Sequence, residues 1–203
     1  MKTEHYKQEF QKAVFQTIAE NYLVPFELNL FVNHNLYRNN TTYEIIYTAI
    51  LKLYGESDNS IDLNNVKGQC LSFHRQISEI IKDTLQINSI LTIGYVNFNG
   101  QDFYKFEKIN NNLFRVQADK REVVDIHVWL TLPSYEIIDV TFLAHITYVN
   151  STPEMKEKLK KATDFPYYFG SANFLYLNEL ISYHPKYVGE DILKKNGFIR
   201  QAT

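Results

Sequence analysis

Cysteine is almost missing from this chain: Cys70 is the only one in 203 residues. A single cysteine cannot form an internal disulfide, and it cannot supply the several thiolates of a Cys-rich zinc site. The histidines show no H-x-x-x-H or comparable ligand spacing. We therefore expect a protein without disulfides and without a bound metal or other cofactor.

An excess of positive charge is also missing. Lys and Arg number 21 against 23 Asp and Glu, which leaves a formal net charge of −2. The densest basic run, Lys156 to Lys161, is interrupted by Glu157 and is typical of the solvated face of a helix. Because nucleic-acid binding needs a strongly positive surface, nucleic acid is not an expected partner.

Long apolar runs are absent as well. No stretch approaches the roughly 18 apolar residues that a membrane span requires. The N-terminal sequence MKTEHYKQEFQK has no apolar core of the kind found in a Sec signal. We expect a protein of the reducing cytoplasm with no membrane contact. The sequence is equally compatible with a delivered bacterial toxin or effector that has deamidase activity.

Apolar side chains are plentiful enough for one folded core. Hydrophobic residues make up 45% of the chain, which argues against disorder, and a chain of this length fits a single domain. No repeat, linker or low-complexity tract divides it. We expect one domain over residues 1–203, with an N-terminal helical part (1–65), a catalytic core (66–142) and a C-terminal helical part (143–203).

Apolar residues recur at helical spacing in three segments before residue 86. The expected helices cover about residues 3–22, a segment capped by Thr41 or Thr42, and about residues 70–85. In the third helix, one stripe would face a core and consists of Cys70, Phe73, Ile77, Ile80, Ile81 and Thr84.

After residue 88 the pattern changes to short strand-like segments separated by turn residues. Their short links predict a mainly antiparallel sheet, and helices are expected again after Pro153. The order of helices, sheet and helices predicts an α+β fold. The expected strands cover 89–98, 102–109, 113–118, 123–131 and 135–141, and the expected C-terminal helices cover 154–163, 171–183 and a short segment that starts at Gly189.

The last two expected strands place a histidine opposite an aspartate. If Pro133 lies at the tip of the turn, His127 pairs with Asp139 on one face of the sheet, with their Cβ atoms about 5 Å apart. A slip of one residue would destroy the separation of polar and apolar faces. On the other face, the same register makes apolar pairs of Val128 with Ile138, Ile126 with Val140, and Val124 with Phe142.

Together with Cys70, this pair has the composition of a thiol-based catalytic site. An imidazole can take the thiol proton if a carboxylate holds its other ring nitrogen. An imidazolium ion and the positive end of a helix dipole both favour the thiolate, and the N–H groups of the same helix start could bind an oxyanion. We therefore predict Cys70 as nucleophile, His127 as base and Asp139 as the residue that orients the base.

The other histidines fit this chemistry less well. His74 shares the helical face of Cys70 but would lie one turn deeper than the open helix end. The remaining histidines, in peripheral segments or after the Asp139 strand, are His5, His34, His145 and His184.

Three short motifs resemble those of the transglutaminase-like superfamily. They are Gly68-Gln69-Cys70, His127-Val128-Trp129 and Asp139-Val140-Thr141. In that superfamily a Gly-Gln-Cys segment opens a helix, and His-x-Trp and Asp-x-Thr segments are strands. The resemblance covers about residues 66–142. It implies a papain-like α+β fold with Cys70, His127 and Asp139 as the triad.

The resemblance also implies a reaction. Members attack a carboxamide or peptide carbonyl to form a thioester, which an amine or water then resolves. The calcium-dependent members also have a tryptophan upstream of the cysteine and extra β-domains. Here the only tryptophan is Trp129, and the chain is too short for those domains. This favours a compact protease, amidase or deamidase over a protein cross-linking enzyme.

Two other functions remain open. An arylamine N-acetyltransferase has the same triad order, although the Arg-Gly-Gly segment that precedes the cysteine in that family is absent here. A binding or scaffold protein could keep the fold without turnover. The aromatic segment 165–183 would then be its partner surface, although that segment also fits a core helix. The leading prediction is a cysteine hydrolase or acyltransferase that acts on a peptide or protein amide.

Overall fold

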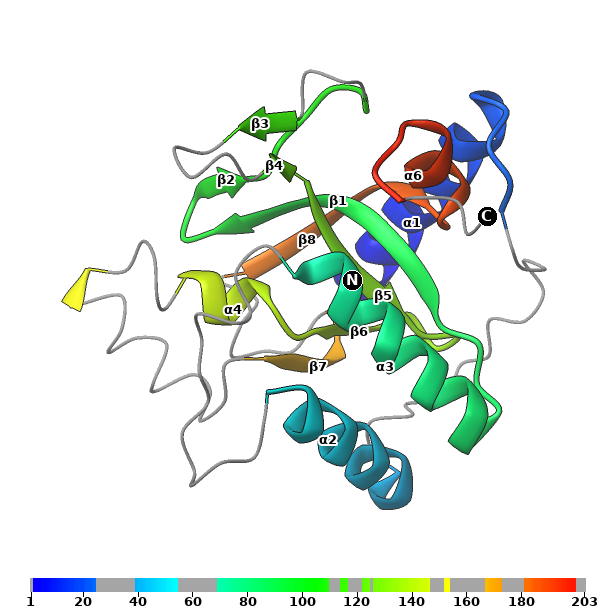
Figure 1. Cartoon of the computed structure of the whole chain (residues 1–203), viewed down its shortest axis with the longest axis vertical. Coiled ribbons are helices and arrows are strands. Elements are labelled where there is room, and N and C mark those ends of the chain that lie inside the picture. The colour runs from blue at the N-terminus through cyan, green and yellow to red at the C-terminus, as the bar shows by residue number, and fades with distance from the viewer. Residues whose placement is uncertain are drawn as a thin grey trace.

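The computed structural model describes residues 2–24, 39–54, 69–109, 114–116, 122–124, 126–146, 152–153, 167–172 and 181–199 (Figure 1). Within these residues, helices pack against both faces of an antiparallel sheet. The expected α+β class is confirmed.

The three helices expected before the sheet are present. They are α1 (Lys2–Ala19), α2 (Asn40–Tyr54) and α3 (Cys70–Leu85). α3 begins and ends at the predicted residues. Of the residues predicted to face the core, Ile77 and Ile81 are fully buried, whereas Thr84 is exposed. His74, which was not counted in that stripe, is also fully buried.

One six-stranded antiparallel sheet lies at the centre of the fold. Its strands are β1 (Ile90–Phe98), β2 (Gln101–Phe103), β5 (His127–Thr131), β6 (Glu136–Asp139), β7 (Tyr168–Ser171) and β8 (Ile181–Val188). β1 is the longest strand and pairs with β2, β5 and β8, while β6 joins β5 to β7. A separate two-stranded sheet contains β3 (Phe114–Val116) and β4 (Glu122–Val124).

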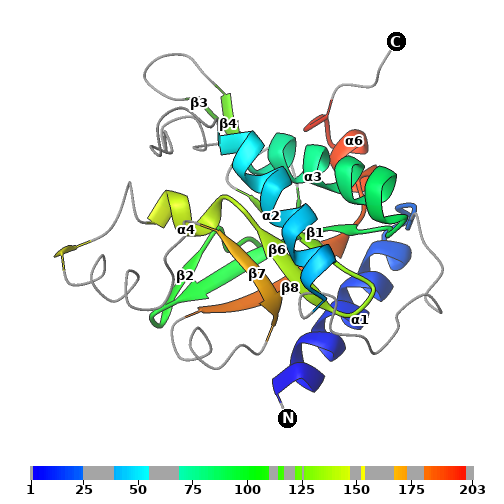
Figure 2. The same ribbon diagram turned by 90° about the horizontal axis from the view of Figure 1, so that it is seen from below.

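Two hydrophobic cores lie on opposite faces of the central sheet. α2 and α3 cover one face, where Ile46 and Ile77 pack against a cluster that includes Val128. α1 covers the other face, where Phe10 packs in a cluster with Trp129. Figure 2 shows α2 and α3 together on one side and α1 apart from them. Because successive strand residues point to opposite faces, the two cores share the strand β5.

Two of the expected strands have the wrong extent. The strand predicted over 102–109 is only Gln101–Phe103, because Tyr104 adopts a positive φ of 60° that ends the extended conformation. The strand predicted over 123–131 is divided into β4 and β5, which lie in different sheets. Val124 was predicted to pair with Phe142, but it pairs with Phe114.

The helix predicted over 171–183 is wrong in its described residues. Ser171 ends β7, and residues 181–183 begin β8. β8 then continues through Pro185, where a helix end was expected. Proline has no N–H for a sheet ladder, and in the described part of the chain β8 pairs only with β1, so Pro185 lies in an edge strand.

The C-terminal part is therefore not the helical part that was predicted over 143–203. Besides β7 and β8, it contains one described helix that matches the prediction, α6 (Asp191–Lys195), ahead of Asn196-Gly197. A short helix that was not expected, α4 (Phe142–His145), follows β6. The helix predicted over 154–163 lies outside the described residues.

Candidate active site

Cys70 is the first residue of α3. The carbonyl of Gln69 accepts the first helical hydrogen bond, from the N–H of Phe73 at 2.9 Å, and the Gln69 side chain makes no capping bond. The N–H groups at a helix start have no acceptor within the helix, and the positive end of the helix dipole lies there. Cys70 is half-buried, and its Sγ lies 3.9 Å from the carbonyl oxygen of Ile126. The thiol is therefore next to the residue that precedes β5.

His127 and Asp139 lie together, although the predicted hairpin register is wrong. Leu130 pairs with Ile138, so the turn is centred on Ser134 and not on Pro133. Tyr135, with a positive φ of 62°, supplies the extra turn residue. The pairing moves by two residues, which preserves the face of every side chain.

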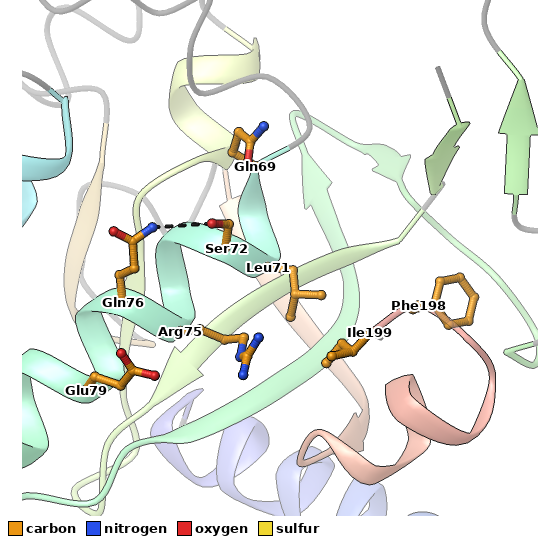
Figure 3. Close-up of a pocket in the computed structure, with 8 residues that line it drawn as sticks. All are labelled: Gln69, Leu71, Ser72, Arg75, Gln76, Glu79, Phe198 and Ile199. Carbon is orange, nitrogen blue, oxygen red and sulfur yellow. Dashed lines mark hydrogen bonds between the residues drawn. The ribbon is translucent and has the colours of Figure 1, made fainter. Parts of the chain in front are cut away.

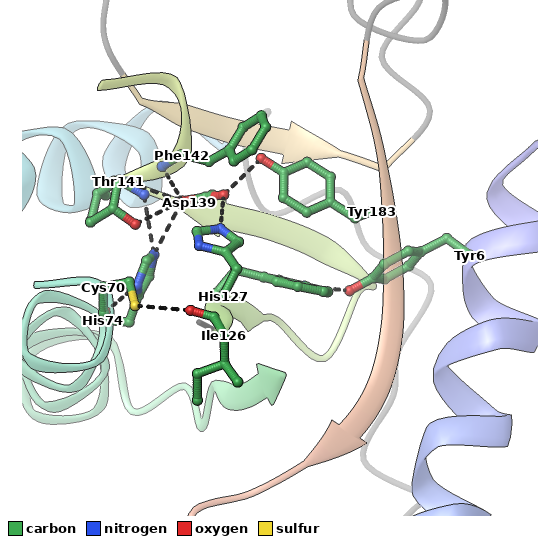
Figure 4. A network of polar contacts seen from close by, with 11 residues as sticks. Tyr6, Cys70, His74, Ile126, His127, Asp139, Thr141, Phe142 and Tyr183 are labelled. Carbon is green, nitrogen blue, oxygen red and sulfur yellow. Dashed lines mark hydrogen bonds and ion pairs between the residues drawn. The ribbon is translucent and has the colours of Figure 1, made fainter. Parts of the chain in front are cut away.

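The three predicted triad residues meet in one place. His127 Nε2 lies 2.6 Å from Asp139 Oδ2, and both side chains are almost fully buried. Figure 4 shows His127 joined to Asp139, with the Cys70 sulfur on the side of α3 and directed at the carbonyl of Ile126. The nitrogen that remains for the thiol is Nδ1, because Nε2 donates its proton to the carboxylate. The order sulfur, imidazole, carboxylate is the one that thiol catalysis needs.

Several donors fix the Asp139 carboxylate. Its Oδ2 also accepts the hydroxyl of Tyr183 at 3.0 Å. Its Oδ1 accepts the backbone N–H groups of Thr141 at 3.0 Å and Phe142 at 3.1 Å, at the start of α4. Burial by itself would raise the pKa of Asp139, but the charge and hydrogen bond of His127 and the Thr141 N–H hold it well below its usual range. Asp139 is therefore an anion at neutral pH.

The environment also determines the charge of His127. Burial would lower the pKa of the imidazole, but the charge of Asp139 and its hydrogen bond outweigh burial. A side-chain hydrogen bond and the charge interaction with Cys70 act in the same direction, and the pKa of His127 rises from 6.5 to about 9. At neutral pH the imidazolium form of His127 therefore predominates.

His74 is a neutral link between α3 and the end of β6. Its Nδ1 donates to the carbonyl of Cys70 at 2.5 Å, and its Nε2 accepts the N–H of Val140 at 3.1 Å. Burial, only partly offset by the charge of Asp139, lowers the pKa of His74 to about 4. Both ring nitrogens are engaged by the backbone, so His74 has no nitrogen for the thiol proton. The sequence also favoured His127 over His74 as the base, and this geometry agrees with that preference.

These two histidines predict a stability maximum near pH 6.5. The folded pKa of His74 is below its unfolded value, so its contribution is present above pH 6.5 and is lost as the pH falls toward 4. The folded pKa of His127 is raised, so its contribution is present below pH 6.5 and is lost as the pH rises through about 9. We expect the protonation of His74 at low pH to reduce the free energy of unfolding by about 3 kcal/mol. Urea denaturation from pH 4 to 9 measures it, and a flat acid limb would contradict it.

Tyr183 was missed in the sequence because its segment was interpreted as a helix. The signal for a strand was the alternation of Ile181, Tyr183 and Tyr187 with polar residues between them, and the structure buries these three side chains. Burial and the negative charge of Asp139 raise the pKa of Tyr183 well above 10. The hydroxyl therefore stays protonated and donates to the carboxylate.

Replacing Tyr183 with phenylalanine is expected to cost about 1.5–3 kcal/mol of folding free energy, because a hydrogen bond to a charged, buried carboxylate is lost. The pKa of Asp139 should rise. Chemical denaturation and an NMR titration of the His127 imidazole measure the effects. Tyr187→Phe is the matched control, since Tyr187 on the same strand donates to Glu20 at 3.1 Å, away from the site. An equal change of the His127 titration in both variants would contradict the specific role of Tyr183.

Aromatic rings cover the His127 imidazole. The Tyr104 ring stacks on it with centroids 5.4 Å apart and an interplanar angle of 22°, and the Phe142 ring lies 5.5 Å away. Trp129, the tryptophan of the His-x-Trp motif, is fully buried and its Nε1 donates to the Tyr6 hydroxyl at 2.9 Å. These contacts hold the imidazole plane and keep water from most of the ring.

A surface groove runs along the outer face of α3 (Figure 3). Its volume is about 510 Å³, and it lies between α3 and the segment after α6, with Gln69 at one end and Phe198 on the opposite wall. Cys70 is not part of its lining, because Cys70 shares the inward face of α3 with His74. The groove therefore approaches the residue before the thiol but does not contain the thiol.

A metal-binding cluster is not evident in the described ranges. Among these residues, no group of three or more His, Cys, Asp or Glu side chains is arranged to hold a metal ion. In the same part of the chain, every helix is too short or too polar to cross a bilayer.

Comparison with known proteins gives no relative. No family model matches the chain, and no curated protein and no solved structure is significantly similar to it. The geometry of Cys70, His127 and Asp139 is therefore the main guide to function.

Proposed function

We propose that this protein is a cysteine hydrolase or acyltransferase that acts on an amide or peptide carbonyl through a thioester. The observation that carries the proposal is the arrangement of the thiol, the imidazole and the carboxylate. The Cys70 thiol lies 3.9 Å from the carbonyl of the residue before His127, and His127 Nε2 lies 2.6 Å from a buried carboxylate that also accepts the Tyr183 hydroxyl and two backbone N–H groups.

Each triad residue has a defined task in this reaction. The Cys70 thiolate forms a C–S bond to the carbonyl carbon, and the carbonyl electrons move onto oxygen. The N–H groups at the start of α3 stabilise this oxyanion. When the tetrahedral intermediate collapses, the C–N bond breaks and the imidazolium of His127 gives its Nδ1 proton to the leaving amine.

Resolution of the thioester uses the same groups in reverse. Water or a second amine attacks the carbonyl carbon, neutral His127 takes its proton, and the C–S bond breaks to restore the thiolate. Asp139 keeps Nε2 protonated throughout, so Nδ1 always faces the sulfur. The raised pKa of His127, about 9, supports its role as the acid that protonates the amine.

The fold that we propose is transglutaminase-like, within the papain-like class. In support, the nucleophile opens a helix that packs on an antiparallel sheet, and the histidine and aspartate lie on adjacent strands. We further propose a peptide or protein amide as the substrate and the cytoplasm as the location.

Capture of the acyl-enzyme tests this proposal. Peptide aldehydes and acyloxymethyl ketones resemble an amide carbonyl and bond covalently to an activated thiol. We expect one adduct per chain on Cys70 by intact-mass and peptide mass spectrometry, and none in Cys70→Ala. A panel that includes aryl acetates with an arylamine acceptor distinguishes N-acetyl transfer from amide cleavage.

A low reactivity of Cys70 would contradict the proposal. If Cys70 reacts with these probes and with iodoacetamide no faster than a free thiol at pH 7, the thiolate–imidazolium pair is not formed and the proposal fails. A binding protein without turnover would give that result, and its Cys70→Ala variant would still bind the partner.

A further inference from the structure

A second set of interacting polar side chains lies on β8, on the face turned away from the Cys70 site. Ser182 and His184 are partly exposed, whereas Tyr183 between them is buried and reaches Asp139. α1 packs along β8 (Figure 1) and brings Glu9 to His184. The sequence placed His184 in a peripheral segment without a partner, since Glu9 is far away in the chain.

Ser182, His184 and Glu9 form a chain of hydrogen bonds. Ser182 Oγ lies 2.9 Å from His184 Nε2, and His184 Nδ1 is hydrogen-bonded to Glu9 Oε1 at 3.4 Å, with Glu9 Oε2 3.2 Å away. Because a carboxylate only accepts, Nδ1 carries the imidazole proton and Nε2 is left to accept the hydroxyl proton of Ser182. A nucleophile, a base in hydrogen-bond contact and a third group that orients the base are the parts of a serine-hydrolase site.

The neighbouring residues hold the imidazole in place. Tyr95 of β1 pairs with His184 across the sheet, and the two rings are stacked with centroids 4.6 Å apart and an interplanar angle of 9°. The ammonium groups of Lys105 and Lys186 lie 5.3 and 5.6 Å from the Tyr95 ring centroid. Lys105 is also paired with Asp102 at 2.6 Å, so the two ammonium groups serve mainly to hold the Tyr95 ring against His184.

The site is open to a small molecule. About a fifth of the His184 side chain and a quarter of the Glu9 side chain are exposed (21% and 26%). The imidazole is therefore fixed on one side by Tyr95 and Glu9 and is accessible on another.

We propose that Ser182 is a second nucleophile, with His184 as its base and Glu9 as the positioning residue, and that this site cleaves carboxylic esters. Ser182 Oγ bonds to the ester carbon while its proton moves to His184 Nε2. The ester C–O bond then breaks, and the alcohol leaves with that proton. Water attacks the acyl-serine by the same route, which releases the acid and restores the hydroxyl.

A fluorophosphonate probe tests this site in the Cys70→Ala protein, so that the result does not depend on the thiol. The Oγ–P bond forms, the P–F bond breaks, and fluoride leaves while His184 takes the hydroxyl proton. We expect an adduct on Ser182 by peptide mass spectrometry, and hydrolysis of p-nitrophenyl acetate that Ser182→Ala abolishes. His184→Gln should slow both about 100-fold or more, and Glu9→Gln about 10-fold or more.

Control variants separate this chemistry from general reactivity. Ser89 is bonded to Ser78 at 2.7 Å and has no described imidazole partner, so Ser89→Ala should change nothing. Thermal melting verifies that each variant is folded. If His184→Gln does not fold, His184→Asn replaces it in the test. An adduct that forms elsewhere than on Ser182, or equally fast without His184, would overturn the proposal.

Discussion

Asp139→Asn is expected to reduce amide turnover by about 10³- to 10⁴-fold, the size of effect that the loss of an orienting carboxylate has in a catalytic triad. An asparagine has nearly the same shape, but its amide nitrogen donates. To accept this donor, Nε2 of His127 must lose its proton, and Nδ1 then carries a proton toward the sulfur. In that tautomer the imidazole cannot accept the thiol proton.

The same variant changes the charge of His127. The carboxylate that raises the pKa of the imidazole to about 9 is removed, while burial remains. We expect the pKa of His127 to fall below its ordinary value of 6.5. An NMR titration of the imidazole measures this fall, and the pH dependence of iodoacetamide labelling measures its effect on the thiol.

Asp191→Asn is the matched control for Asp139→Asn. Asp191 also accepts a backbone N–H, from Leu23 at 2.8 Å, and pairs with a cation, Lys195 at 2.9 Å, but it lies on α6 away from the triad. It should leave turnover unchanged. If Asp139→Asn keeps more than about a tenth of the turnover, Asp139 does not select the tautomer of His127.

His74→Ala is expected to lower the free energy of unfolding by about 3–5 kcal/mol, since it removes a buried imidazole that bonds two backbone groups and opens a cavity. The carbonyl of Cys70 and the N–H of Val140 lose the imidazole that joins them. The start of α3 is then no longer tied to the end of β6. We therefore expect slower labelling of Cys70 in the protein that remains folded.

Urea denaturation at pH 7 measures the stability, and iodoacetamide labelling in the absence of urea measures the thiol. His74→Gln keeps a donor and an acceptor and should recover part of the loss. His5→Ala is the control, because the side chain of His5 is 65% exposed and its loss should cost less than about 0.5 kcal/mol. A loss for His74→Ala as small as that of His5→Ala would show that the buried link is not needed.

Periodicity determined much of the fold from the sequence alone. The helical repeat located α3 from Cys70 to Leu85, and alternation located β1, β5 and β6. His127 and Asp139 were brought to one face correctly even though the turn was misplaced, because an error of two residues leaves every strand residue on its own face. A repeat in the chain therefore predicts which way a side chain points more reliably than which residue it meets.

Tertiary structure alone decided the partners within the site. Tyr183 reaches Asp139 from a strand that was predicted as a helix, and His74 joins two backbone groups that lie far apart in the sequence. Glu9 and His184 meet only because α1 packs along β8. Such contacts depend on how whole elements pack, and local periodicity contains no information about distance across a core. The sequence by itself determined the type and face of the triad residues, and the packing of helices on the sheet decided which groups hold them.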